Sequence, residues 1–251
     1  NVPGIKIYVG SSTGTLLVDD QDPLEKIFST GRRLIAVHSE DETILQRNYK
    51  EKEGTTDIHD HYKIRSVEAA LTCTKRLIDL AIKHKRRFHL CHLTSKEELD
   101  FISPILKQYP FITTEVSPQH LFQYAPDIYD KFGTFAQINP PIREKYHSEA
   151  LQKGLLNGFI GCIGTDHAPH TIAEKQQPFG KAPSGMPGLD TALPIMLNNV
   201  HNNWCTLQQV TQWMSKTVSD YFKIVNKGQI KVGYDADLVL INTSAKRTVT
   251  N

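Results

Sequence analysis

The sequence predicts an α/β protein that forms part of a (β/α)8 barrel, with the start of a small β appendage at its C-terminal end. Short apolar runs alternate with helical stretches along the chain, which is typical of parallel βα units. Five such runs each carry a polar side chain, in four cases at or near the carboxyl end, where barrel strands gather their reactive groups. A doubly wound open sheet would explain the alternation, but not five polar strands that converge.

The five apolar runs at 4–9, 34–38, 88–93, 111–116 and 159–164 are the predicted strands, and residues 10–14 form the loop after the first. Residues 66–84 carry apolar side chains at helical spacing, and Ser66 is the expected N-cap. Ser95 and Glu98 have the spacing of a capping box, which predicts the start of another helix. Because a closed barrel of this type needs eight strands, we expect about three strands to be missing from this chain.

The C-terminal residues follow a different pattern. Residues 227–241 are predicted to form a turn and a strand outside the βα alternation. We therefore predict a partial barrel over residues 1–225 and the start of a β-sandwich segment over residues 226–251.

The composition excludes several classes of protein. A 39% hydrophobic and 22% charged content is ordinary for a globular protein. The net charge of +2 is mixed along the chain, so we expect neither nucleic acid nor a membrane as partner. No apolar run approaches the roughly 20 residues that cross a bilayer, and we find no signal-peptide pattern. The four cysteines lack CxxC pairing, which favours reduced thiols and a cytoplasmic protein.

The densest group of reactive side chains is Gly-Thr-Asp-His-Ala-Pro-His at 164–170, with Lys175 five residues further on. An aspartate at a strand end before a histidine-rich loop suits a metal ligand that also moves a proton. The alternative is that Asp166 is a helix N-cap beside surface histidines.

This segment resembles the signature of the dihydroorotase family. Other segments match the family in the same order, to about residue 241: they are 4–14, 37–41, 91–94, 115–121, 139–143, 182–185 and 227–239. The resemblance implies a zinc-dependent cyclic-amide hydrolase of pyrimidine biosynthesis, which interconverts N-carbamoyl-L-aspartate and L-dihydroorotate.

The resemblance also implies a metal centre whose ligands are Lys6, His38, His92 and Asp166. Imidazole suits zinc at neutral pH. A lysine has an unperturbed pKa of about 10.4, and desolvation inside a barrel would ease the loss of its proton. A neutral lysine takes up carbon dioxide, and the resulting carbamate on Lys6 would bridge two cations. We therefore expect one zinc ion per chain, or two if Lys6 is carboxylated.

Cys91 and Glu115 lie where some family members hold a further zinc ion. The alternative for Cys91 is a buried small hydrophobic side chain.

The remaining site residues implied by the resemblance handle the substrate. Asp166 would be the general acid/base that carries a proton to the leaving ring nitrogen. His170, Asn139 and the backbone of Ser184 and Gly185 would bind the substrate's carboxylate. Arg143 is a second candidate for anion binding, with a surface arginine as the alternative.

One further His-x-His, His59 to His61, has the spacing of the family's first metal motif. That motif lies upstream of the bridging lysine in the family, whereas residues 55–62 form a polar stretch before a helix. We interpret residues 55–62 as a loop, and we expect the family's own His-x-His to lie before residue 1 or to be absent.

Two other functions stay open. One is a different cyclic amidohydrolase, such as a hydantoinase, dihydropyrimidinase or allantoinase, although His-Ala-Pro-His favours an acidic substrate. The other is a non-catalytic scaffold for aspartate transcarbamoylase. The family resemblance also implies a homodimer.

Overall fold

The computed structural model describes residues 2–11, 16–246 and 248. Five parallel strands form one sheet: β1 (Gly4–Tyr8), β2 (Leu34–His38), β3 (Phe88–Leu90), β4 (Ile112–Val116) and β5 (Cys162–Ile163). They lie in the order β1-β2-β3-β4-β5, so each strand pairs with its neighbour in sequence. A doubly wound sheet reverses its order at a switch point, whereas the wall of a (β/α)8 barrel runs in chain order. The strand order therefore confirms the predicted fold class.

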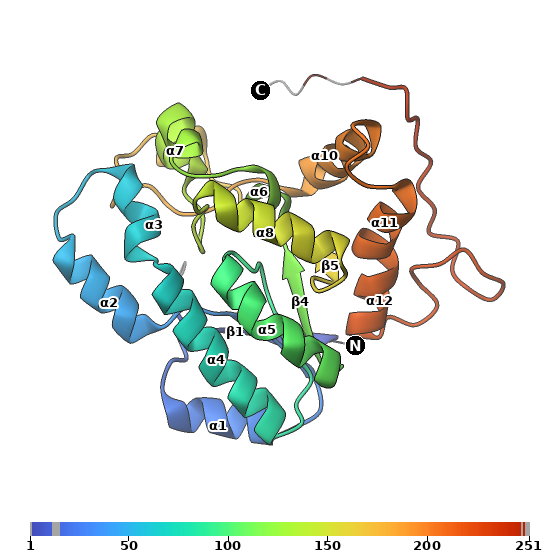
Figure 1. Cartoon of the computed structure of the whole chain (residues 1–251), viewed down its shortest axis with the longest axis horizontal. Helices are drawn as coiled ribbons and strands as arrows, with labels where there is room; N and C mark the ends of the chain where they lie inside the picture. Colours follow the sequence, from blue (N-terminus) through green and yellow to red (C-terminus); the bar gives the residue numbers. More distant parts are fainter. Residues whose placement is uncertain (1, 12–15, 247, 249–251) are drawn as a thin grey trace.

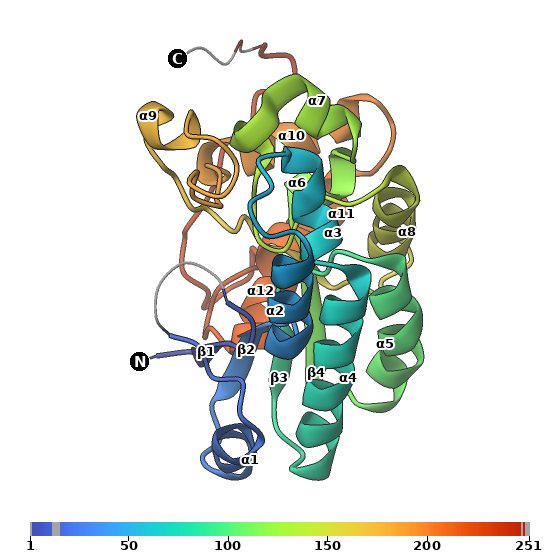
Figure 2. The same ribbon diagram turned by 90° about the vertical axis from the view of Figure 1, so that its left-hand side faces the viewer.

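Helices cover one side of this sheet and extend beyond its carboxyl end. Figure 1 shows α4 and α5 in front of the strands, and Figure 2 shows α4, α5 and α8 along one side, with β1 on the other. The helical elements are α1 (Gln21–Ser29), α2 (Glu42–Glu51), η1 (Ile58–Asp60), α3 (His61–Ile64), α4 (Val67–Lys83), α5 (Lys96–Gln108), α6 (Pro118–Phe122), α7 (Asp127–Phe132), η2 (Gly133–Ala136), α8 (Lys145–Leu156), α9 (Ile172–Lys175), α10 (Leu189–His201), α11 (Leu207–Thr211), η3 (Gln212–Lys216) and α12 (Thr217–Phe222).

Both predicted helix starts are confirmed. The Ser66 hydroxyl accepts a hydrogen bond from the Ala69 amide at the start of α4, and Ser95 does the same for the Glu98 amide in α5. The reciprocal half of the capping box differs, because the Glu98 carboxylate accepts from the Ser95 hydroxyl (2.8 Å). Both serines satisfy amides that have no partner within the helix.

The apolar core lies between the sheet and the helices. Successive side chains of a strand point to opposite faces. Ile35, Val37, Phe88 and Leu90 are buried in one cluster with α4 residues such as Leu77. The alternate positions of the same strands, among them Lys6, His38 and His89, therefore share the opposite face.

The sheet has two edge strands, and the opposite face is accessible near them. Within the described residues β1 and β5 each pair with one neighbouring strand only. Lys6 on β1 and Asp166 after β5 are both exposed there, although His38 and His92 between them are buried.

Two predictions about local structure are wrong. Residues 226–246 contain no strand, because a strand needs a neighbour for its backbone hydrogen bonds; instead Val232 and Leu240 are fully exposed. The segment runs along the outside of the body (Figure 1). The stretch around His59 is also no plain loop, since η1 and α3 cover residues 58–64 and His61 is buried. The predicted loop at 10–14 lies partly outside the described residues.

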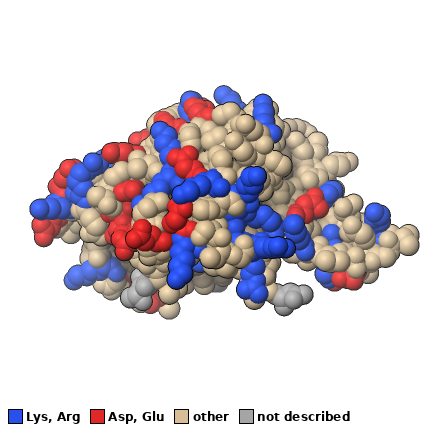
Figure 3. Space-filling view, turned by 90° about the horizontal axis from the view of Figure 1, so that it is seen from below, with Lys and Arg blue, Asp and Glu red and all other residues tan. Residues whose placement is uncertain are grey.

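The surface carries both signs of charge. Basic and acidic side chains are interspersed over the face shown in Figure 3. None of the described helices has the length and apolar character to cross a membrane.

Candidate metal centre and substrate site

The centre of the site is a pair of buried histidines on neighbouring strands. His38 ends β2, and His92 follows β3. The Nδ1 atom of His38 lies 3.2 Å from Nε2 of His92. Burial lowers the pKa of both imidazoles, and for His92 the charges of Lys6 and His38 add to the effect. Both rings are therefore neutral at pH 7, the form in which imidazole binds metals.

This spacing fits zinc. Two nitrogens held about 2.0–2.1 Å from one tetrahedral zinc ion lie about 3.3 Å apart. His92 also has a buried Nδ1 atom with no hydrogen-bond partner among the described residues. The donor set of two imidazoles, a carboxylate and a lysine therefore suits the predicted metal.

Glu40 and Arg65 fix the orientation of His38. His38 Nε2 donates to the Glu40 carboxylate (2.8 Å), which leaves Nδ1 with a lone pair directed at His92. Burial opposes ionisation of Glu40, but Arg65 and His38 outweigh it and lower its pKa to about 2. The Arg65 guanidinium donates to the same carboxylate, and both side chains are buried. A carboxylate behind a metal-binding histidine sets its tautomer and raises its basicity.

Lys6 lies on one edge strand and Asp166 follows the other, on either side of this pair. The positive charge of Lys6 acts to lower the pKa values of His38, His92 and Asp166, and its amine lies 5.2 Å from the centre of the Tyr8 ring. The ligand atoms of His38, His92 and Asp166 do not all come within 4.8 Å of one another in the described residues, so the structure pairs the two histidines without bringing Asp166 into contact with both. Partial desolvation raises the pKa of the Asp166 carboxyl even though the residue is accessible from the open face. The described residues leave Lys6 exposed, so they do not provide the burial that carbamate formation needs.

Backbone strain marks two of the four candidate ligands. His92 (φ 35°) and Asp166 (φ 46°) both have positive φ angles, which residues other than glycine seldom adopt. Such conformations cluster at functional sites because the surrounding structure enforces them.

A second donor cluster lies beside the first. Ligand atoms of His89, Cys91 and Glu115 all lie within 4.8 Å of one another. His89 Nε2 is 3.3 Å from Glu115 Oε2. Burial and the nearby Glu115 raise the pKa of the Cys91 thiol to about 12, so it is protonated unless a cation displaces its proton. Gly164 permits this approach, since a Cβ there would lie 2.4 Å from Glu115 Oε2.

The predicted substrate residues also come together. His170 Nε2 donates to the Ser184 carbonyl (3.2 Å), and the Gly185 amide donates to Gln137 O (2.9 Å), two residues before Asn139. The Asn139 Oδ1 atom is buried and has no partner among the described residues. Asn139, His170 and the Ser184–Gly185 backbone thus form one group beside the segment that carries Asp166.

Arg143 lies apart from this group. It is buried rather than a surface arginine, and its guanidinium donates to Thr94 Oγ1 (3.0 Å) and to the Arg65 carbonyl (2.8 Å). These contacts are those of a brace between loops, and they give no support to the predicted anion binding.

Sequence reasoning missed His89, Glu40 and Arg65. His89 could have been found from strand alternation, because residues two apart on a strand share a face and Cys91 was already a candidate. Glu40 belongs to the matched segment 37–41, but nothing in the sequence indicates that Arg65 reaches it.

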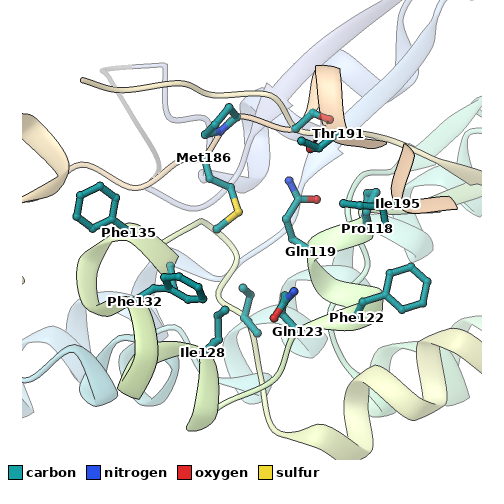
Figure 4. Close-up of a pocket in the computed structure, with 14 residues that line it drawn as sticks. Pro118, Gln119, Phe122, Gln123, Ile128, Phe132, Phe135, Met186, Thr191 and Ile195 are labelled. Atoms are coloured by element: carbon teal, nitrogen blue, oxygen red, sulfur yellow. Dashed lines mark hydrogen bonds between the residues drawn. The ribbon is translucent and has the colours of Figure 1, made fainter. Parts of the chain in front are cut away.

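An apolar pocket of about 350 Å³ is lined by residues of α6, α7 and α10 and by Met186 (Figure 4). The Met186 side chain and the Gln119 amide point into it, and Phe122, Phe132 and Phe135 line its sides. Gln119 Nε2 donates to the Thr165 carbonyl (3.3 Å), and Thr165 directly precedes Asp166 in the chain. None of the candidate metal ligands lines the pocket, so it is separate from the metal centre.

Comparisons with known proteins identify relatives of this chain. The chain is 36% identical over 225 residues to a dihydroorotase of Methanosphaera stadtmanae, covering 88% of this chain and 51% of that protein. It is 31% identical over 248 residues to a dihydroorotase of Methanosarcina acetivorans, covering 94% and 53%. The chain thus spans about half the length of the curated relatives it matches.

A solved structure shares the fold. The L-hydantoinase (dihydropyrimidinase) of Arthrobacter aurescens superposes with a TM-score of 0.88 at 26% identity, over 93% of this chain and 54% of that chain. The model of the amidohydrolase family matches residues 30–251, which is most of the sequence. The parallel strands in chain order and these matches show that the chain belongs to the amidohydrolase family.

Proposed function

We propose that this chain is part of a zinc-dependent dihydroorotase, which closes N-carbamoyl-L-aspartate into L-dihydroorotate and opens the ring in reverse. The observation that carries the proposal is the buried histidine pair at 3.2 Å, with the Asn139–His170–Ser184 group packed against the loop that follows Asp166. The histidine pair supports our assignment of a metal centre, and the second group suits the carboxylate of an acidic ring. The dihydroorotases among the relatives support the same function.

We assign zinc to His38, His92, Asp166 and Lys6. Bound zinc supplies Lewis-acid polarisation and lowers the pKa of water. In ring opening, Asp166 takes a proton from the attacking water and delivers it to the ring nitrogen as the C–O bond forms and the C–N bond breaks. Its raised pKa suits a group that both accepts and releases this proton. Asn139, His170 and the Ser184–Gly185 backbone hold the substrate's carboxylate.

The zinc content remains a separate proposal. Carboxylated Lys6 would bridge two zinc ions, whereas an unmodified Lys6 would leave one. A further zinc ion would take Cys91 and Glu115, to which we now add His89. Zinc analysis, combined with mass spectrometry for the 44 Da that carbon dioxide would add to Lys6, distinguishes these states.

The cysteine pattern supports a cytoplasmic location. The family resemblance alone supports a homodimer and association with aspartate transcarbamoylase. Size-exclusion chromatography with light scattering, with and without that transcarbamoylase, tests both.

A hydantoinase is the second candidate, because the solved structure with a TM-score of 0.88 bears that name. Hydantoin is a neutral ring without a carboxylate, so it would leave His170 and Asn139 without their proposed partner. The higher identity to dihydroorotases favours the first function.

A panel of cyclic amides tests the proposal. The assay uses the whole protein, including any sequence beyond residues 1–251. We expect turnover of L-dihydroorotate well above that of hydantoin, dihydrouracil or allantoin. Asp166→Asn should lower kcat by about 10²–10⁴-fold, the range for loss of a general acid/base. Activity on hydantoin without dihydroorotate would overturn the assignment. Fewer than one zinc ion per chain after purification would favour the alternative function, a non-catalytic scaffold for aspartate transcarbamoylase.

A further inference from the structure

Lys175 is a buried lysine with an unusual set of partners. It ends α9 and is 5% exposed. Its ammonium donates to three backbone carbonyls, Gln137 O (3.0 Å), Pro183 O (2.9 Å) and Gly185 O (2.9 Å). An ammonium has three N–H donors, so each donor has one acceptor.

These carbonyls belong to two separate segments, residues 137–140 and 182–185. The first carries Asn139 and the second carries Ser184. Three further hydrogen bonds join them. Gly185 N donates to Gln137 O, and the side-chain amide of Gln137 donates to Ala182 O (3.1 Å) and to Ser184 Oγ (2.9 Å). Gly185 also has a φ of 143°, and a Cβ there would lie 2.6 Å from Ala168 O. The joined segments therefore pack against the loop that follows Asp166.

Two buried histidines donate to two other carbonyls of the first segment. His61 Nε2 donates to Ile138 O (2.8 Å), and His120 Nε2 donates to Pro140 O (3.0 Å). The backbone is thus fixed on both sides of Asn139, whose Oδ1 atom is buried without a partner among the described residues.

Stability alone does not explain this lysine. Within the described residues it has no carboxylate partner, and desolvation lowers its pKa to about 8. A buried ammonium is expensive, and an apolar side chain with a rearranged loop often replaces such a group at no loss of stability. Its ordered donors do, however, set the relative position of two backbone segments.

We propose that Lys175 is a positioning residue that fixes the 137–140 and 182–185 segments, and that it thereby sets the preference for an acidic over a neutral cyclic amide. This inference rests on the proposed function, because it assigns the substrate's carboxylate to Asn139 and Ser184.

Two variants, Lys175→Met and its control Lys181→Met, test this inference. Both are made in the whole protein, including any sequence beyond residues 1–251. Lys181 lies in the same region, is exposed, and has no side-chain partner in the described structure. We expect Lys175→Met to raise the KM for L-dihydroorotate by about tenfold or more. This is the size of effect expected if the displaced segments lose one hydrogen bond to the substrate's carboxylate. The kcat for dihydroorotate and the kinetics with dihydrouracil should change less than about threefold. Lys175→Arg, which keeps a charged donor, should recover part of the KM.

A second measurement does not depend on activity. Amide hydrogen exchange at Gly185, whose N–H is bound to Gln137 O, should quicken in Lys175→Met and stay unchanged in Lys181→Met. If Lys175→Met does not fold, Lys175→Gln gives the same readout with a shorter, neutral donor. Unchanged exchange, or an equal loss with dihydroorotate and dihydrouracil, overturns the inference. Faster exchange at Gly185 in Lys175→Met, together with no turnover of dihydroorotate by the parent protein, would support the positioning role of Lys175 but reject the proposed function.

Discussion

At the scale of single residues, the site depends on side chains that never reach the substrate. Glu40 is fully buried yet ionised, because Arg65 and His38 share its carboxylate. Its role is to direct one nitrogen of His38 toward His92. A pair of this kind contributes little net stability compared with apolar residues, so its value lies in the orientation it imposes.

Glu40→Gln should therefore weaken zinc binding by about 10–100-fold, the range for loss of a partner behind a metal ligand. Competition with a chromophoric chelator measures the dissociation constant. The matched control is Glu68→Gln, which removes an exposed carboxylate paired with Arg47. Equal zinc affinity in the folded Glu40→Gln variant and in the control would contradict the role assigned to Glu40.

At the scale of elements, the helices begin where hydroxyl side chains replace missing backbone partners. Ser95 at the start of α5 is buried and bonds both the Glu98 amide and the Glu98 carboxylate. Burial raises the pKa of Glu98, so its hydrogen-bond partners matter more than those of a surface carboxylate. Thr206, at the start of α11, makes a comparable capping box in an exposed position.

Ser95→Ala should lower the free energy of unfolding by about 2–3 kcal/mol, since it removes a helix cap and the closest of the hydroxyl groups that donate to the buried Glu98 carboxylate. Thr206→Ala should cost about 1 kcal/mol, because water replaces the lost contacts there. Urea denaturation of the two variants gives the comparison. An equal loss in both would show that burial of the Ser95 cap has no energetic consequence.

The elements were also the part that sequence predicted best. Each strand run, such as 34–38, is a short and mainly apolar stretch, so local composition was enough. The tail at 226–246 was predicted as a strand for the same reason, but a strand also requires a neighbour that local composition does not report. His61 escaped for a related reason, since its burial depends on residues near 138 and 179.

At the scale of the whole molecule, several buried histidines tie stability to pH. Desolvation lowers the pKa of His61 and of His120 to about 4. In the unfolded chain the pKa would be about 6.5, so the unfolded state binds more protons between these values. Stability is therefore complete above pH 6.5 and declines as the pH falls toward 4.

His61→Gln should make this decline shallower, because glutamine keeps a donor for Ile138 O but does not titrate. A shift of the His61 size is worth on the order of 3 kcal/mol of unfolding free energy. Thermal unfolding from pH 7 to pH 4 measures the slope, with the exposed His201→Gln as control. If the stability of His61→Gln falls as steeply with pH as that of the parent protein, His61 does not contribute to the pH dependence of stability.

For the site as a whole, the sequence predicts candidate ligands, which stay a prediction, but not the side chains that support them. Lys6, His38, His92 and Asp166 stand at strand ends, and parallel strands bring their carboxyl ends together. Lys175 belonged to a recognised segment, yet its three carbonyl partners come from positions 38 residues before it to 10 residues after it. Such contacts depend on loop paths, which no local pattern encodes.

The four candidate ligands are drawn from β1, β2, the end of β3 and the loop after β5, and they lie between positions 6 and 166. Ligands that come from separate βα units meet only after every intervening unit has docked. Long-range closure of this kind is slow and comes late in folding. Tight zinc uptake during refolding should therefore lag behind the recovery of helical signal, so that the metal centre reports completion of the tertiary structure.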